Sequence, residues 1–168
     1  MTVSAILEQS RRFFEKTVRA VPESDATLCL SPDSWSVSGI VEHIVMAERA
    51  LLARFDAAER SETSLCNPAR ETRIVEKLRD RADRAEAPER AWPAGRFETL
   101  NEALGEFLAA RDRTIQFAAA HEPQLYYLTV MHPLVGKVNG FEMLLIIAAH
   151  SDRHAAQIQE ICARGLTP

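Results

Sequence analysis

Cysteine is scarce in this sequence, and the cysteines that it has form no framework. Only Cys29, Cys66 and Cys162 occur among 168 residues, an odd number with wide spacing. Small proteins stapled by disulfides carry cysteines in even numbers and at much higher density. The chain is therefore expected to depend on a buried hydrophobic core. Its length suits a single domain over residues 1–168, which is large enough to bury such a core.

An excess of basic charge and long apolar runs are also missing. The chain has 20 Lys and Arg against 24 Asp and Glu. A surface that binds phosphates usually shows a basic excess, so no nucleic-acid partner is expected. The most apolar stretch, residues 143–149, is far shorter than the roughly 20 residues that span a bilayer. No signal peptide is recognisable at the start, so we expect a cytoplasmic protein without a membrane partner.

Apolar residues at helical spacing are what the sequence does have. They predict long helices over about residues 3–20, 37–58, 98–120 and 140–163. Apolar side chains three or four positions apart give each helix a face that can be buried. Four such helices, with few alternating strand-like runs, predict an all-α fold, a four-helix bundle.

Several residues mark where these helices begin and end. Pro22 stops the first helix because proline cannot continue one. Asn139 is a suitable N-cap, and Glu142 three residues later completes the pattern of a capping box. Gly165 is expected to end the last helix.

A long connection separates the second and third long helices. Residues 59–97 are rich in Arg, Glu and Ala and are interrupted by prolines. We predict one short helix near residues 70–79 within this connection. Residues 76–90, mostly charged residues and alanine, predict a solvated face or a mobile loop. Crossovers of this length are typical of bundles that are not simple up-down hairpins.

The connection before the last helix leaves an alternative open. Residues 125–130, Leu-Tyr-Tyr-Leu-Thr-Val, have a strand-like composition, so a mixed fold with a small hairpin there is the second interpretation. His121 and His132 lie beside prolines in this connection, and we expect both to be solvated.

Two histidines of the last helix are placed as metal ligands often are. His150 and His154 are four positions apart, so their Cβ atoms lie about 5–6 Å apart on one helix face. The same stripe carries Met143, Ile147 and Ile158. The two imidazoles therefore face the interior or a cleft. An imidazole buried without a polar partner costs about 1–3 kcal/mol, so these nitrogens need partners.

A third histidine has the same relation to its helix. His43 lies between Ile40 and Ala47 on the inward face of the second helix. Three imidazoles can hold one divalent ion and leave coordination positions open, as in catalytic sites. On the residues alone, a hydrogen-bonded histidine cluster in the core remains the alternative.

Three segments together resemble the DinB/YfiT-like family of metal-binding four-helix bundles. They are residues 34–43 (SWSVSGIVEH), 132–136 (HPLVG) and 150–158 (HSDRHAAQI). The family shows a Trp-Ser/Thr helix start before its first histidine, a Pro-x-x-Gly-type loop, and a terminal His-x-x-x-His-x-x-Gln-Ile. The resemblance covers nearly the whole chain in the same order.

The resemblance implies a metal site and a class of chemistry. It places the metal triad on His43, His150 and His154, with nickel or zinc as the usual ion. Imidazole suits both metals, so the ligands do not choose between them. Family members with known activity resemble transferases and isomerases that depend on a low-molecular-weight thiol, and others are described as metal-dependent hydrolases. The leading hypothesis is a metal-dependent transferase that conjugates a small thiol to an electrophile, with a role in stress or detoxification.

Two residues of the last helix are candidates for a supporting role. Arg153, next to His154, could meet an anionic substrate, but pairing with Asp152 or Glu160 on the surface is the favoured interpretation. Gln157 could hydrogen-bond a ligand histidine or make a contact between helices.

Two residues near His43 have alternative interpretations as well. Trp35 could line the cleft, or it could fasten its loop to the core. Gly39 stands where many relatives have Glu or Gln, three residues after the Ser36 cap, and could make room for a ligand or a neighbouring chain.

A second class of function stays open. The protein could be a non-catalytic binding module, with or without metal, that acts as a homodimer. Family membership alone does not establish catalysis, because function resides in the site.

Overall fold

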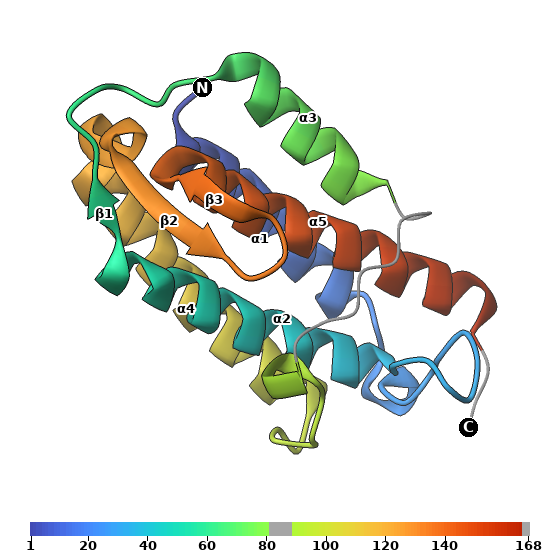
Figure 1. Ribbon diagram of the computed structural model, residues 1–168. Coiled ribbons are helices and arrows are strands. Elements are labelled where there is room, and N and C mark those ends of the chain that lie inside the picture. Colours follow the sequence, from blue (N-terminus) through green and yellow to red (C-terminus); the bar gives the residue numbers. More distant parts are fainter. Residues whose placement is uncertain (81–88, 166–168) are drawn as a thin grey trace.

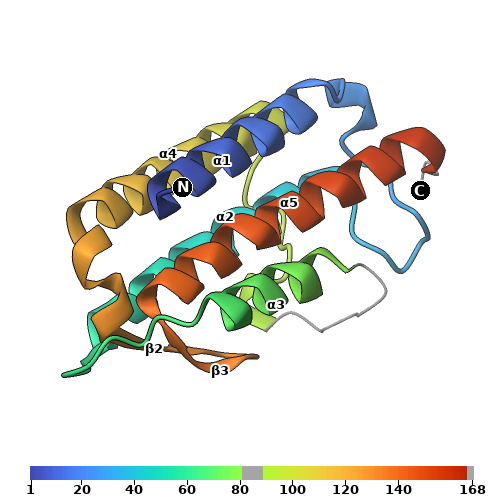
Figure 2. The ribbon, with the colours of Figure 1, turned by 90° about the horizontal axis from the view of Figure 1, so that it is seen from above.

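Four long helices lie side by side in the computed structural model, which describes residues 1–80 and 89–165 (Figure 1). They are α1 (Val3–Arg19), α2 (Val37–Leu52), α4 (Leu100–His121) and α5 (Gly140–Arg164). In Figure 2, α1 and α4 form one layer and α2 and α5 the next. The predicted all-α bundle is confirmed. Among the described residues, no helix has the length and apolar character needed to cross a membrane.

Side-chain caps start the long helices at the positions that local sequence favours. Thr2, Ser36 and Thr99 each accept a hydrogen bond from a backbone N–H in the first turn that follows. Asn139 and Glu142 form the predicted capping box, with the Asn139 N–H donating to Glu142 Oε2 over 2.9 Å. These contacts satisfy N–H groups that have no partner within the helix.

The long connection contains a fifth helix. Helix α3 (Pro68–Arg79) corresponds to the short helix predicted near 70–79 and packs on the outer side of α5 (Figure 2). Of the charged stretch 76–90, residues 81–88 lie outside the described part of the chain. Short 3-10 turns join the larger elements: η1 (Glu23–Asp25), η2 (Ala53–Ala57), η3 (Glu89–Ala91) and η4 (Glu122–Tyr127).

A small antiparallel sheet lies beside α5, in the order β1-β2-β3. The strands are β1 (Glu59–Arg60), β2 (Leu128–His132) and β3 (Gly136–Asn139). A hairpin is therefore present, although it begins later than the run 125–130 suggested, because residues up to Tyr127 belong to η4. Gly136 has a φ of 81° at the start of β3, a conformation that favours glycine.

The core consists of two apolar clusters at opposite ends of the bundle. The first is built from Phe14, Ile40, Phe107 and Ile158, among others. The second is built from Leu7, Leu125, Val138, Met143 and Leu144, among others. In each long helix, the residues of one cluster are followed along the chain by residues of the other.

A buried polar network separates the two clusters. Arg111 of α4 is fully buried. Its guanidinium donates to both carboxylate oxygens of Glu48 of α2, at 2.7 and 3.0 Å. The same group donates to the Leu7 carbonyl of α1 at 3.1 Å and to the Ser151 hydroxyl of α5 at 2.9 Å. Thr114 donates to Glu48 Oε1 at 2.8 Å. One guanidinium therefore contacts all three of the other long helices.

Removal of this guanidinium should strongly destabilise the fold. We expect Arg111→Ala to lower the free energy of unfolding by about 3–5 kcal/mol, because Glu48 would stay buried without its cation. Arg113→Ala is the matched control, since Arg113 is exposed on the same helix and its loss should change stability by about 0.5 kcal/mol or less. Urea unfolding of both variants measures the difference. A gap below about 1 kcal/mol would contradict the assigned role.

Candidate metal centre

The structure brings the three predicted histidines together between α2 and α5. His43 Nε2 lies 3.2 Å from His150 Nε2, and His154 Nε2 lies 3.1 Å from the same atom. A set of nitrogen atoms, one from each ring, lies within 4.8 Å of one another. His43 of α2 thus forms one cluster with His150 and His154 of α5. His43 and His150 are 107 positions apart in the chain.

The spacing of these nitrogens fits ligands of a single ion. Nitrogens bound at 2.0–2.1 Å lie about 3.3 Å apart in tetrahedral geometry and about 3.0 Å apart in octahedral geometry. The two separations that involve His150 Nε2, 3.1 and 3.2 Å, fall between these values, and the three nitrogens lie within 4.8 Å of one another. The three histidines are close enough to bind one metal ion, and the geometry does not select its identity.

The remaining ring nitrogens have partners that fix the direction of two ligands. His43 Nδ1 donates to the Ala91 carbonyl over 2.8 Å. Since a carbonyl only accepts, the proton of the neutral ring lies on Nδ1 and the lone pair lies on Nε2. His154 Nδ1 lies 2.8 Å from Gln157 Oε1, which sets the same tautomer. Both Nε2 lone pairs are thus available at the centre of the cluster.

Burial favours the neutral form of His43 and His150, the form that binds metals. Burial lowers the pKa of His43, which is only 3% exposed. The pKa of His150 lies well below its usual range, first through burial and then through the neighbouring charges of His154 and His43. A neutral imidazole is the ligand form, so these rings need not lose a proton at neutral pH.

His132 and His121 differ from the prediction that both are solvated. His132 is 7% exposed, and its Nδ1 accepts hydrogen bonds from the N–H groups of Leu134 and Val135, both at 3.1 Å. The prediction was wrong for His132 because the turn after Pro133 folds back onto the ring. His121 is half-buried and stacks on Phe117, with ring centroids 4.2 Å apart.

His132 also acts electrostatically on the cluster. Burial lowers its own pKa, and the charge of Arg54 lowers it further. The charge of His132 is in turn one of the causes that lower the pKa of His150. The end of β2 therefore places a buried imidazole within electrostatic reach of His150.

Arg153 contacts backbone carbonyls at the end of α3. Its guanidinium donates to the Leu78 carbonyl at 3.1 Å and to the Asp80 carbonyl. The anions suggested as its partners pair elsewhere: Asp152 with Arg79, and Glu160 with Arg164. Arg153 thus joins α3 to the turn of α5 that separates the two candidate ligands His150 and His154. A contact with substrate stays a prediction.

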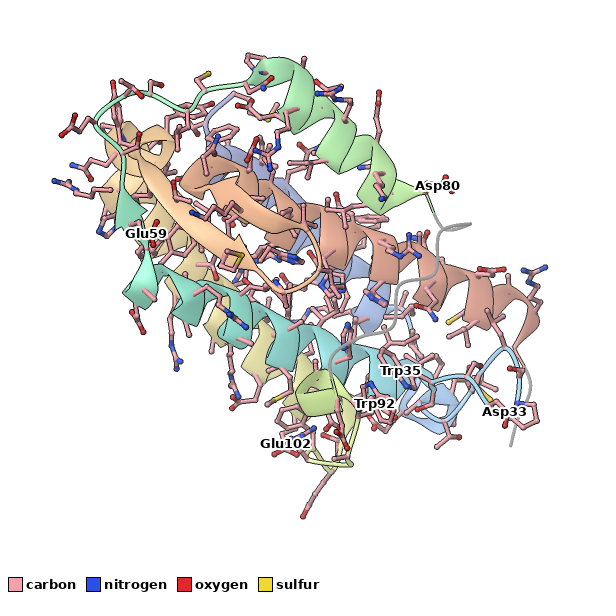
Figure 3. The ribbon with its side chains drawn as sticks, viewed as in Figure 1. Asp33, Trp35, Glu59, Asp80, Trp92 and Glu102 are labelled. Atoms are coloured by element: carbon pink, nitrogen blue, oxygen red, sulfur yellow. The ribbon has the colours of Figure 1, made fainter. Side chains whose placement is uncertain are left out.

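Trp35 contributes to both the core and the cluster. Trp35 is labelled in Figure 3, and its ring packs against the first apolar cluster. Its ring centroid lies 4.7 Å from that of His43. The two interpretations of this residue are therefore compatible. The indole covers one face of a candidate ligand while it anchors the loop before α2.

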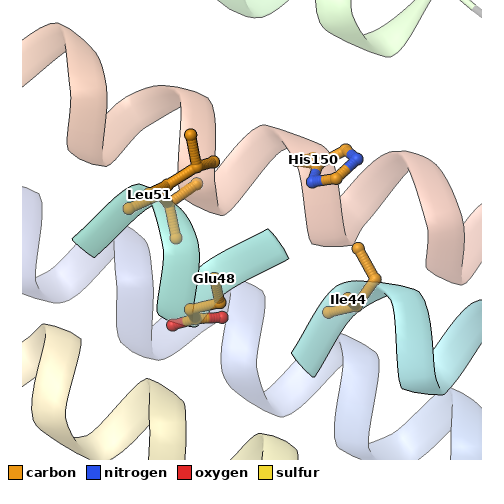
Figure 4. Close-up of a pocket in the computed structure, with 5 residues that line it drawn as sticks. Ile44, Glu48, Leu51 and His150 are labelled. Atoms are coloured by element: carbon orange, nitrogen blue, oxygen red, sulfur yellow. The ribbon is translucent and has the colours of Figure 1, made fainter. Parts of the chain in front are cut away.

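Residues near the cluster also leave little free space beneath it. Figure 4 shows a crevice between α2 and α5, with Ile44, Glu48 and Leu51 below His150. The crevice is too narrow to hold a water molecule. His150 and His154 are both partly exposed, whereas His43 is buried.

One contributing residue escaped the sequence analysis. Glu42, next to His43, is 4% exposed and binds the loop that supplies the Ala91 carbonyl. Gly39 faces the same loop, where a Cβ would lie 3.2 Å from Cγ of Pro93. Gly39 therefore makes room for a segment of its own chain. In the sequence, the one local indication of a role for Glu42 was its spacing from Gly39 and His43, which places all three on one helix face.

The fold and the cluster together define a helical bundle with a three-histidine centre between two of its helices. Comparison with known families agrees with this description: the DinB superfamily matches residues 6–158. The chain belongs to the DinB superfamily, which confirms the resemblance. A search of curated proteins finds no match. Membership and the histidine cluster fit a metal-binding protein of this superfamily.

Histidines with lowered pKa values predict that acid weakens the metal-free fold. The imidazoles of His43, His132 and His150 stay neutral in the folded protein. In the unfolded chain the same histidines bind protons as pH falls below about 6.5. Stability is therefore complete above about pH 6.5 and is lost as pH falls toward the folded-state values, at up to about 1.4 kcal/mol per pH unit for each histidine.

Urea unfolding of the metal-free protein between about pH 7 and 5 measures this effect. His150→Gln should make the dependence shallower, and His121→Gln, outside the cluster, should leave it in place. An unchanged slope in His150→Gln would show that acid acts through other groups.

Proposed function

We propose that the protein binds one divalent metal ion through His43, His150 and His154 and uses it to transfer a small thiol to an electrophile. The convergence of three Nε2 atoms carries this proposal, with those of His43 and His154 at 3.2 and 3.1 Å from that of His150. Zinc and nickel are the ions of choice, because neutral imidazoles bind both well. We expect small-molecule substrates, since the crevice below His150 is too narrow to hold a water molecule and the His150 and His154 rings are partly exposed.

A bound ion would act as a Lewis acid that lowers the pKa of a thiol or a water. The chain's own groups prepare the site for it. Three protein ligands leave further positions free, as in catalytic and not in structural sites. The Ala91 carbonyl and Gln157 hold two rings in the tautomer that binds metal. Arg153 lies beside the cluster and is the candidate for interaction with an anionic substrate.

Metal content tests the first part of the proposal. Protein purified without a metal-affinity tag should contain about one ion per chain by elemental analysis, and His150→Ala should lose affinity by more than the roughly 100-fold that outer-sphere changes produce. His121→Ala, a histidine outside the cluster, is the control that should bind as the wild type does. Equal metal content in all three proteins, or none in any, would refute the site.

Thiol transfer tests the second part. We expect conjugation of a physiological thiol to at least one member of a panel of electrophiles, followed by its loss on chelation and its return on addition of zinc or nickel. His150→Ala should be inactive under the same conditions. Bound metal without turnover on any pair would favour the non-catalytic binding module. The homodimer and the cytoplasmic location stay predictions, and analytical ultracentrifugation measures the former.

A further inference from the structure

We infer that Glu42 is a positioning residue, which holds the Ala91 carbonyl against His43 and thereby presents the Nε2 atom of His43 as a ligand. This inference rests on the proposed metal function and assigns a further residue to that site. One face of α2 carries Gly39, Glu42 and His43, at the spacing of three and four that places side chains together. All three contact the segment 91–96.

The Glu42 carboxylate binds this segment through most of its acceptor positions. Oε1 accepts from the Ala94 N–H at 2.8 Å, and Oε2 accepts from the Gly95 N–H at 3.0 Å and the Arg96 N–H at 3.3 Å. The Arg96 guanidinium forms an ion pair with Oε1 and also donates to the Trp92 carbonyl at 3.0 Å. Three consecutive N–H groups around one carboxylate leave the turn a single well-satisfied arrangement.

The turn is built to accept this carboxylate. Gly95 has a φ of 70°, a left-handed conformation in which glycine is unstrained. Pro93, two residues before it, approaches Gly39 so closely that a Cβ there would lie 3.2 Å from Pro93 Cγ. The turn is thus held on α2 by this contact and by the Glu42 carboxylate, and Ala91 lies just before it.

The position of Ala91 determines what His43 can do. Ala91 is 5% exposed, and its carbonyl accepts from His43 Nδ1 at 2.8 Å. Without that acceptor, the ring is free to rotate or to carry its proton on Nε2. A proton on Nε2 occupies the lone pair that faces His150, and the ring then cannot bind an ion there. Glu42 therefore acts on the site through the backbone and without contact to the ligand atoms.

Two measurements on the full chain separate positioning from a purely structural role. Nitrogen NMR of ¹⁵N-histidine-labelled, metal-free protein reports the tautomer of His43, and chelator competition reports affinity for Zn²⁺ alone. Glu42→Ala should give a mixture of His43 tautomers and at least about tenfold weaker Zn²⁺ binding. Glu42→Gln keeps one acceptor oxygen and should be intermediate. Glu23→Ala is the control, because Glu23 accepts the Leu100 N–H far from the cluster.

The outcomes distinguish this inference from the proposed function. A folded Glu42→Ala variant with wild-type Zn²⁺ affinity and a pure Nδ1–H tautomer would overturn the positioning role and leave the metal site intact. Wild-type protein that binds no Zn²⁺ would refute the proposed function, and the tautomer would then decide the positioning role alone. If Glu42→Ala does not fold, Glu42→Gln decides, and an unchanged tautomer with unchanged affinity counts against the inference.

Discussion

The buried contact between Arg111 and Glu48 is the constraint on which the rest of the structure depends. Apolar cores tolerate repacking, so helices packed only by apolar side chains can shift against one another at small cost. A buried guanidinium has far fewer arrangements in which its hydrogen-bond donors all find acceptors. Arg111 contacts α1, α2 and α5 at once, and its partner Ser151 directly follows His150. The same network that sets the register of the helices therefore sets the position of His43 opposite His150.

Local patterns predicted the four long helices and suggested the histidine cluster, although the run predicted over 37–58 continues past the end of α2 at Leu52. The apolar stripes of α1, α4 and α5 gave their limits to within a few residues, because a helix face repeats every three or four positions. The capping box at Asn139 was equally readable, since both partners lie within one turn. Histidines on two inward stripes indicated a shared centre for the same reason: helix phase fixes where a side chain points.

Contacts between distant segments were not predictable in this way. No local pattern shows that Glu42 meets N–H groups 52 to 54 positions later, or that Arg153 reaches the end of α3. His132 was assigned to solvent because proline marks a turn, although the direction in which a turn folds depends on its surroundings. The hairpin was misplaced by a few residues, since strand-like composition continues through η4.

The use of a main-chain carbonyl to orient His43 has a consequence for how the chain can change over evolution. The oxygen does not depend on the side chain at position 91, so the hydrogen bond can persist through those substitutions that the buried position accommodates. Selection on ligand orientation falls instead on Glu42, which contacts neither the histidine nor the solvent side of the centre. Homologues that keep all three histidines and lose this carboxylate would retain the ligand set without its support. Such homologues would differ in metal affinity although their three histidines are identical.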